Sequence, residues 1–232
     1  MTECEWLRST DPEPMLEYLR RWACERKTRL VACATAREVW HLLTDPRSRT
    51  AVYIAEQFAD DRVAYPNLTA AFNAAYEVWK EIPLRLSRRH GKWVKSHAGS
   101  RAAKEAAHLA CIAANPELNL RMGRYGPWRG NARERYALAN HLRDIFGNPF
   151  QTPVLNAICR QWNGGTVPKF AQAIYDDATF ADLPILADAL EDAGCTDANI
   201  LDHCRSAERH TRGCWVVDLL CELPRPRLVF RR

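Results

Sequence analysis

The 232-residue sequence contains no run of about 18 uncharged apolar residues, the length that an α-helix needs to cross a bilayer. The residues after Met1, TECEWLRSTDPEP, lack both the basic stretch and the apolar stretch of a secretory signal peptide. The nine cysteines are an odd number, which does not suit a complete disulfide framework. We therefore expect a cytoplasmic protein without a membrane span, whose cysteines are reduced thiols.

Motifs of several enzyme classes are also absent. The sequence has no G-x-S-x-G of serine hydrolases, no H-E-x-x-H of metalloproteases and no P-loop G-x-x-x-x-G-K-[ST]. Since no set of residues can be given catalytic roles, the sequence favours a non-catalytic protein and predicts no catalytic residue.

Positive charge is unevenly distributed along the chain. The windows 84–104, 121–135 and 223–232 hold 16 of the 33 lysines and arginines but one of the 28 acidic residues. The rest of the chain carries 17 bases against 27 acids. The pattern indicates an acidic body with three basic segments, which favours a partner of negative charge.

Aromatic residues lie among these bases. Cations that alternate with aromatic rings are typical of proteins that bind single-stranded nucleic acid, and a cationic segment also fits an acidic protein surface. Because no recognition helix or sheet platform is legible, we expect a non-catalytic interaction module that engages an acidic protein partner, with nucleic acid as the alternative and self-association also open. A simpler alternative is a set of solvated loops anchored by tryptophan. The predicted binding residues are Arg85, Arg88, Arg89, Lys92, Trp93, Lys95, Arg121, Arg124, Trp128 and Arg129.

Apolar residues recur at helical spacing through most of the chain. Asp11 and Pro12 have the residue types of an N-cap and a first helical position, and Asp45 and Pro46 repeat them. Gly194 follows an amphipathic stretch as a C′ residue. No convincing alternation of strand length is present outside the terminal RLVF. The sequence predicts an all-α, multi-helical fold with two packed helical halves joined by a basic irregular segment.

The predicted regions follow these patterns. The N-terminal helical region is 1–114, with a basic loop at about 84–100, and the basic linker is 115–131. The C-terminal helical region is 132–222, and the basic tail is 223–232. Four tryptophans on apolar stripes are expected in the cores: Trp22, Trp40, Trp79 and Trp215.

Residues 194–215, GCTDANILDHCRSAERHTRGCW, concentrate cysteine and histidine. Thiolate and imidazole are zinc ligands, and the candidates are Cys195, His203, His210 and Cys214. Their spacing, C-x7-H-x6-H-x3-C, includes no CxxC pair. The alternatives are that the two cysteines are small buried apolar residues, or that Cys195 is a reactive thiol beside a helix start.

Local geometry limits this site. The adjacent His203 and Cys204 would project about 100° apart on a helix, so at most one reaches a shared ion. His210 and Cys214 would share a helix face, but Gly213 argues against a helix between them.

Two further features have weaker chemical implications. His141 and Asp144, three apart on a predicted helix, have the types of a base and an orienting acid, although a solvated pair on the helix surface is the simpler interpretation. The NGG at 163–165 could bind an anion before a helix or simply make a tight turn.

Several segments resemble one family of bacterial proteins, abundant in some large genomes and without an established activity. The segments are MTECEWLRSTDPEPMLEYL (1–19), RKTRLVACATAREVWHLLTDPRSRTAVYIAEQFAD (26–60), LRDIFGNPF (142–150), WNGGTVPKFAQAIYDD (162–177), LPILADALEDAGCTDANILDHCR (183–205) and HTRGCWVVDLL (210–220). The resemblance covers roughly 1–60 and 132–222 and implies a family but no function. At Ala34 and Thr35 the chain departs from it, since the resemblance implies a further cysteine beside Cys33.

Overall fold

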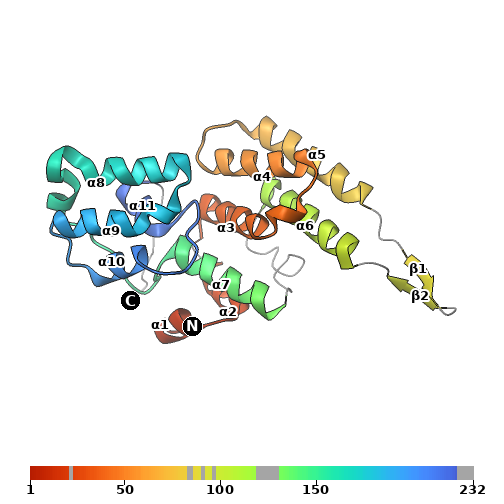
Figure 1. Ribbon diagram of the computed structural model, residues 1–232, viewed down its shortest axis with the longest axis horizontal. Helices are drawn as coiled ribbons and strands as arrows, with labels where there is room; N and C mark the ends of the chain where they lie inside the picture. Colours follow the sequence, from red (N-terminus) through yellow and green to blue (C-terminus); the bar gives the residue numbers. More distant parts are fainter. Residues whose placement is uncertain (21–22, 83–85, 90–91, 96–97, 119–130, 224–232) are drawn as a thin grey trace. The chain divides into compact units, whose positions relative to one another are not determined.

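The computed structural model describes residues 1–20, 23–82, 86–89, 92–95, 98–118 and 131–223, with backbone alone at 86–89, 92–95 and 98–100 (Figure 1). The described residues confirm an all-α fold, to which one short hairpin is added. The α-helices are α1 (Glu3–Arg8), α2 (Pro12–Leu19), α3 (Glu25–Glu38), α4 (Pro46–Ala59), α5 (Tyr65–Glu81), α6 (Ala98–Ala114), α7 (Ala132–Phe146), α8 (Ala157–Asp177), α9 (Leu183–Asp192), α10 (Ala198–Cys204) and α11 (Trp215–Leu220). The remaining elements are the 3-10 turns η1 (Trp40–Leu42) and η4 (Phe180–Asp182) and the strands β1 (Leu86–Arg89) and β2 (Lys92–Lys95).

The chain divides into two compact units. Unit 1 combines Met1–Lys27 with Ala132–Arg232, and unit 2 is Thr28–Asn131. The units share the predicted boundary before Ala132, but residues 1–27 belong with the C-terminal region instead of the N-terminal one. The reason is that α2 packs on α7, and that the indole Nε1 of Trp6 donates to the Gly147 carbonyl, just after α7, at 2.9 Å.

Helix ends follow the local sequence signals. The Asp11 and Asp45 side chains accept hydrogen bonds from the first turns of α2 and α4, which begin at Pro12 and Pro46. At the end of α9, Gly194 has a φ of +83°, and the Cys195 N–H donates to the Leu190 carbonyl. The latter contact is the 6→1 hydrogen bond of a Schellman cap.

Unit 2 is built from α4, α5 and α6, which pack against one another, together with the part of α3 from Thr28 onward. Small residues such as Ala51, Ala75 and Ala110 are fully buried and allow these helices to approach closely. Outside this core, the Arg37 guanidinium of α3 binds the Glu56 carboxylate of α4 through two short hydrogen bonds.

The segment between α5 and α6 contains a hairpin where the sequence predicts an irregular loop. Strands β1 and β2 are antiparallel, with Leu86 opposite Lys95 and Arg89 opposite Lys92. The alternation in Lys92–Lys95 is too short to predict a strand, although tryptophan and valine favour one.

Unit 1 has its own apolar core, made mainly by α8, α9, α10 and α11 (Figure 1). Each of these helices packs on at least one other of the four, and α7 packs on α2 and α11. Within α8, the backbone leaves helical geometry from Trp162 to Gly165, where Asn163, Gly164 and Gly165 have positive φ. The NGG sequence therefore makes a sharp kink within α8, and the helix resumes after it.

The tryptophans differ in how deeply they are buried. Trp215 is buried in unit 1, while Trp40 and Trp79 are partly buried against the core of unit 2. Trp22 lies outside the described residues. Trp6, which the sequence does not single out, is fully buried. No described helix combines the length and the apolar character needed to span a bilayer.

Candidate metal centre

Asp144 lies in the last turn of α7, a helix whose apolar face is formed by buried residues such as Leu138, Leu142 and Ile145. Its position places a carboxylate on the buried side of the helix, where 5% of the residue is exposed. His141 is also buried, so the predicted solvated pair is wrong. A carboxylate at this depth requires partners that offset the loss of its hydration.

Three other chemically active side chains come from the last part of the chain. His203 lies in the last turn of α10, His210 lies in the connection to α11, and Cys214 is the N-cap of α11. Gly213 has a φ of +92°, so the segment from His210 to Cys214 is not helical, as its glycine indicates. The turn, not a shared helix face, brings His210 and Cys214 together.

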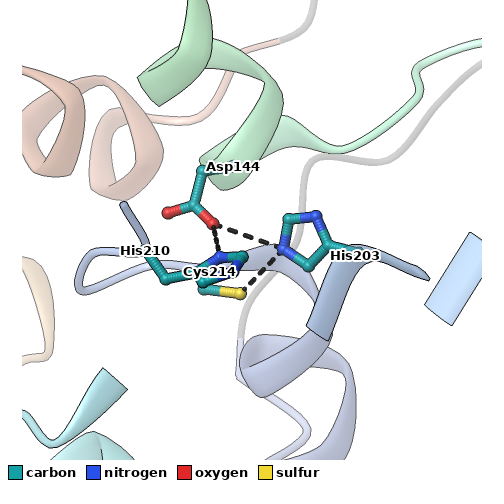
Figure 2. Close-up of side chains that lie close together, drawn as sticks. All are labelled: Asp144, His203, His210 and Cys214. Carbon is teal, nitrogen blue, oxygen red and sulfur yellow. Dashed lines mark hydrogen bonds and ion pairs between the residues drawn. The ribbon is translucent and has the colours of Figure 1, made fainter. Parts of the chain in front are cut away.

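These residues and Asp144 form one compact group, which we call the four-residue cluster (Asp144, His203, His210 and Cys214). One ligand atom from each lies within 4.8 Å of every other. The carboxylate, the two imidazoles and the thiol point toward one another (Figure 2). Among the described residues, it is the one group of three or more histidine, cysteine and acidic side chains that lie close enough together to hold a metal ion.

A single nitrogen of His203 faces two partners. Its Nε2 lies 3.2 Å from the Cys214 sulfur and 3.3 Å from Asp144 Oδ1. A cysteine–histidine–aspartate catalytic triad uses opposite ring nitrogens for the nucleophile and the acid. The approach of a carboxylate oxygen and a thiol sulfur to one ring nitrogen instead suits side chains that share an ion, which would replace the protons now between them.

Within the cluster, Oδ1 of Asp144 lies 2.7 Å from Nδ1 of His210. Residues outside the cluster orient its side chains: Oδ2 of Asp144 accepts hydrogen bonds from the Thr211 N–H and hydroxyl at 2.8 and 3.1 Å. The other nitrogen of His210, Nε2, lies 3.3 Å from the Ser206 hydroxyl. Such outer partners orient carboxylate and histidine ligands in metal sites.

The connection that carries His210 is also tied to α7. The Glu208 carboxylate accepts hydrogen bonds from the Tyr136 hydroxyl at 3.0 Å and from the Asn140 side chain at 2.6 Å. Tyr136 and Asn140 lie on the helix that carries Asp144, so these contacts hold the connection near Asp144.

Burial and charge act together on the protonation of the cluster. Burial raises the pKa of the Cys214 thiol well above its ordinary value, and the Asp144 charge adds to that effect. Burial alone would raise the pKa of Asp144, but hydrogen bonds from His203 and His210 hold it well below its usual range. Burial lowers the pKa of His203 and so favours the neutral ring, the form that binds metals.

The structure brings together three of the four predicted metal ligands. Cys195 is not among them: it lies in the apolar core of unit 1, at the C″ position of the α9 cap, and burial raises its pKa. An apolar residue at that position usually packs back on its own helix. Asp144 completes the cluster instead, and its spacing from the other ligands has no recognisable sequence signal. Cys204, next to His203, is fully buried in the core.

The predicted binding residues of the basic segments fall outside this description. Arg85, Arg121, Arg124, Trp128 and Arg129 lie outside the described residues, and only the backbone is described at Arg88, Arg89, Lys92, Trp93 and Lys95. Nearby bases that are described have partners within unit 2. Arg101 pairs with Glu105 at 2.8 Å, and Lys104 donates to the Ile82 carbonyl.

No protein-family model, curated protein or solved structure matches this chain. The geometry of the four-residue cluster therefore carries the functional argument.

Proposed function

We propose that the protein binds one zinc ion at the four-residue cluster (Asp144, His203, His210 and Cys214), and that the ion stabilises unit 1. The observation that carries the proposal is the convergence of four ligand atoms from three separate segments within 4.8 Å. These ligands would link α7, the end of α10 and the start of α11 through one ion. Linking elements in this way is the usual role of a structural zinc site.

The ligand chemistry supports zinc over other common cations. A thiolate and two imidazoles are ligands of zinc, whereas calcium and magnesium prefer oxygen. A carboxylate and a thiolate together neutralise a divalent ion, so the buried site would carry no net charge. Four protein ligands also fill a tetrahedral zinc site without leaving a position for substrate, which favours a structural ion over a catalytic one.

The distances between the four side chains are close to those of a zinc site, and small side-chain movements would complete it. Zinc bonds of about 2.0–2.3 Å at tetrahedral angles place ligand atoms about 3.3–3.6 Å apart. The contact of His203 Nε2 with Asp144 Oδ1, at 3.3 Å, lies in that range. The His203–Cys214 contact, at 3.2 Å, and the Asp144–His210 contact, at 2.7 Å, are shorter and would lengthen when the ion enters. The widest separation, 4.8 Å, would shorten by about 1 Å, a change that side-chain rotation can supply.

Metal analysis of the purified protein tests this proposal. We expect about one equivalent of zinc per chain, its removal by a strong chelator, and a lower free energy of unfolding after removal. At a free zinc concentration of a hundred times Kd, binding raises the free energy of unfolding by about 2.7 kcal/mol. The proposal would be contradicted if the protein, expressed in medium that supplies zinc, contained no metal after purification and if neither zinc nor a chelator changed its stability.

Cobalt substitution provides a test of the ligand set. Co²⁺ bound by one thiolate and two imidazoles in a tetrahedral site gives intense visible d–d bands and a sulfur-to-metal charge-transfer band. A weak, octahedral-type spectrum would show that the four-residue cluster does not bind the ion as proposed.

A further inference from the structure

Lys27, at the start of α3, is a buried lysine close to the four-residue cluster. Its side chain is 1% exposed, and its ammonium group has three acceptors. Nζ lies 2.6 Å from Asp218 Oδ2, donates to the Gly213 carbonyl at 3.0 Å and makes a short hydrogen bond to the Ile145 carbonyl. An ammonium group has three protons, so each has an acceptor.

The two carbonyls are next to two of the proposed ligands. Ile145 directly follows Asp144, and Gly213 directly precedes Cys214. The Ile145 carbonyl belongs to the last turn of α7, where carbonyls have no partner within the helix. Lys27 therefore both caps α7 beside Asp144 and joins this helix end to the turn that carries Cys214.

The third acceptor of the Lys27 ammonium group is Asp218, in the first turn of α11, the helix that Cys214 caps. The Arg26 guanidinium also binds the Asp218 carboxylate, at 2.8 and 3.1 Å, and the Tyr175 hydroxyl at 2.8 Å. Asp218 thus receives three charge-assisted contacts from α3, which are stronger than neutral hydrogen bonds. These contacts fix α11 relative to the start of α3 within unit 1.

We propose that Lys27 is a positioning residue of the metal centre, whose ammonium group joins the backbone beside Asp144 to the backbone beside Cys214 and so sets the separation of these two ligands. The inference rests on the proposed function, since a ligand separation affects metal affinity only if the cluster binds a metal. Through Lys27, the N-terminal segment would help to position side chains that lie more than 100 positions later in the sequence. Trp6 supports this view, because its indole binds the Gly147 carbonyl just beyond α7.

The effect of Lys27 should be on metal affinity as well as on stability. Outer contacts of metal ligands commonly contribute about 10–100-fold to affinity. We expect Lys27→Met, which keeps the aliphatic volume and removes the ammonium group, to weaken zinc binding by about this factor and to change the d–d bands of the Co²⁺ form. Lys169→Met is the matched control, since Lys169 is an exposed lysine that also donates to a backbone carbonyl, that of Gly164, at 3.0 Å.

The experiment is competition of the full chain with a chromophoric zinc chelator, under conditions where circular dichroism shows native helix content. Leu186→Ala, on α9, which carries none of the ligands, measures the effect of general core destabilisation. We expect Lys169→Met and Leu186→Ala to retain the wild-type Co²⁺ spectrum. A folded Lys27→Met variant with wild-type zinc affinity and spectrum overturns the inference while leaving the proposed function intact.

Two milder variants keep the test decisive if Lys27→Met does not fold. Lys27→Gln keeps a donor without charge, and Lys27→Arg keeps the charge with a different donor geometry. Either should weaken zinc binding and alter the Co²⁺ spectrum, and wild-type behaviour of both overturns the inference. If the wild-type protein binds no zinc, the proposed function fails first and this inference fails with it.

Discussion

His210 and Asp144 are 66 positions apart in the chain, yet Nδ1 of the histidine lies 2.7 Å from Oδ1 of the aspartate. The contact joins the connection after α10 to the last turn of α7. It also places a buried carboxylate beside two imidazoles and a thiol (Figure 2). The proposals about zinc and Lys27 both depend on this meeting of distant segments.

Asp144→Asn should remove most of the zinc affinity. The amide keeps the shape of the side chain but removes the charge that a buried divalent ion requires, so we expect a loss above the hundredfold typical of outer contacts. Asp188→Asn is the control, because Asp188 is exposed and pairs with Arg205 at 2.7 Å, outside the cluster. Chelator competition measures both variants, and equal affinities would show that Asp144 is not a ligand.

Cys214→Ser and Cys195→Ser separate the two candidate thiol ligands. Both cysteines are buried in unit 1, but only the Cys214 sulfur lies beside His203. We expect Cys214→Ser to abolish the sulfur-to-cobalt charge-transfer band and Cys195→Ser to retain it. The reverse result would restore Cys195 as the ligand that the sequence suggests.

Gly147→Ala should destabilise the protein more than Gly164→Ala. Both glycines have positive φ, +69° and +68°, so each substitution carries a backbone cost of roughly 1 kcal/mol or more. A Cβ at Gly147 would also lie 3.0–3.3 Å from ring atoms of Trp215, whereas one at Gly164 has no neighbour within 4 Å. We expect an additional loss of about 1–3 kcal/mol for Gly147→Ala in urea unfolding. Equal losses would mean that the Trp215 ring moves freely.

The buried Asp218 carboxylate should make stability depend on acid pH. Burial opposes its charge, but Lys27 and Arg26 more than offset that effect and lower its pKa. Because the folded pKa lies below the unfolded value of about 3.9, the stabilisation is present above about pH 4 and is lost as the pH falls further.

Asp218→Asn tests this pH dependence. At neutral pH the variant removes the counter-charge of the buried Lys27 ammonium group, which costs about 3–5 kcal/mol. We expect the gap in free energy of unfolding between wild type and variant to narrow below pH 4, measured by urea unfolding with chelator present. A gap that is constant with pH would contradict the ion-pair explanation.

The basic segments provide a prediction that does not depend on the metal. Replacing Arg88, Arg89, Lys92 and Lys95 with glutamine should weaken binding to an acidic partner or polyanion. Gel-shift titration with single-stranded and duplex oligonucleotides across a salt series distinguishes nucleic acid from protein, because counterion release gives a steep salt dependence. No shift at low salt would leave the acidic protein partner.

Much of the local structure follows from short stretches of sequence. Asp11 with Pro12, Asp45 with Pro46, and Gly194 mark helix ends because a cap is satisfied by residues within a few positions. The hairpin was not predictable from its alternation, since each strand has four residues. The membership of residues 1–27 in unit 1 depends on long-range contacts such as that of Trp6 with Gly147.

The sequence by itself determined the helical class, the helix ends and the concentration of cysteine and histidine between 194 and 215, because each depends on neighbours along the chain. Only the tertiary structure decided that Asp144 joins His203, His210 and Cys214 and that Cys195 does not. Residue spacing cannot specify which side chains converge when their segments lie on different helices. Packing of α7, α10 and α11 sets that convergence, and the buried Lys27 links the backbone beside two of the four side chains.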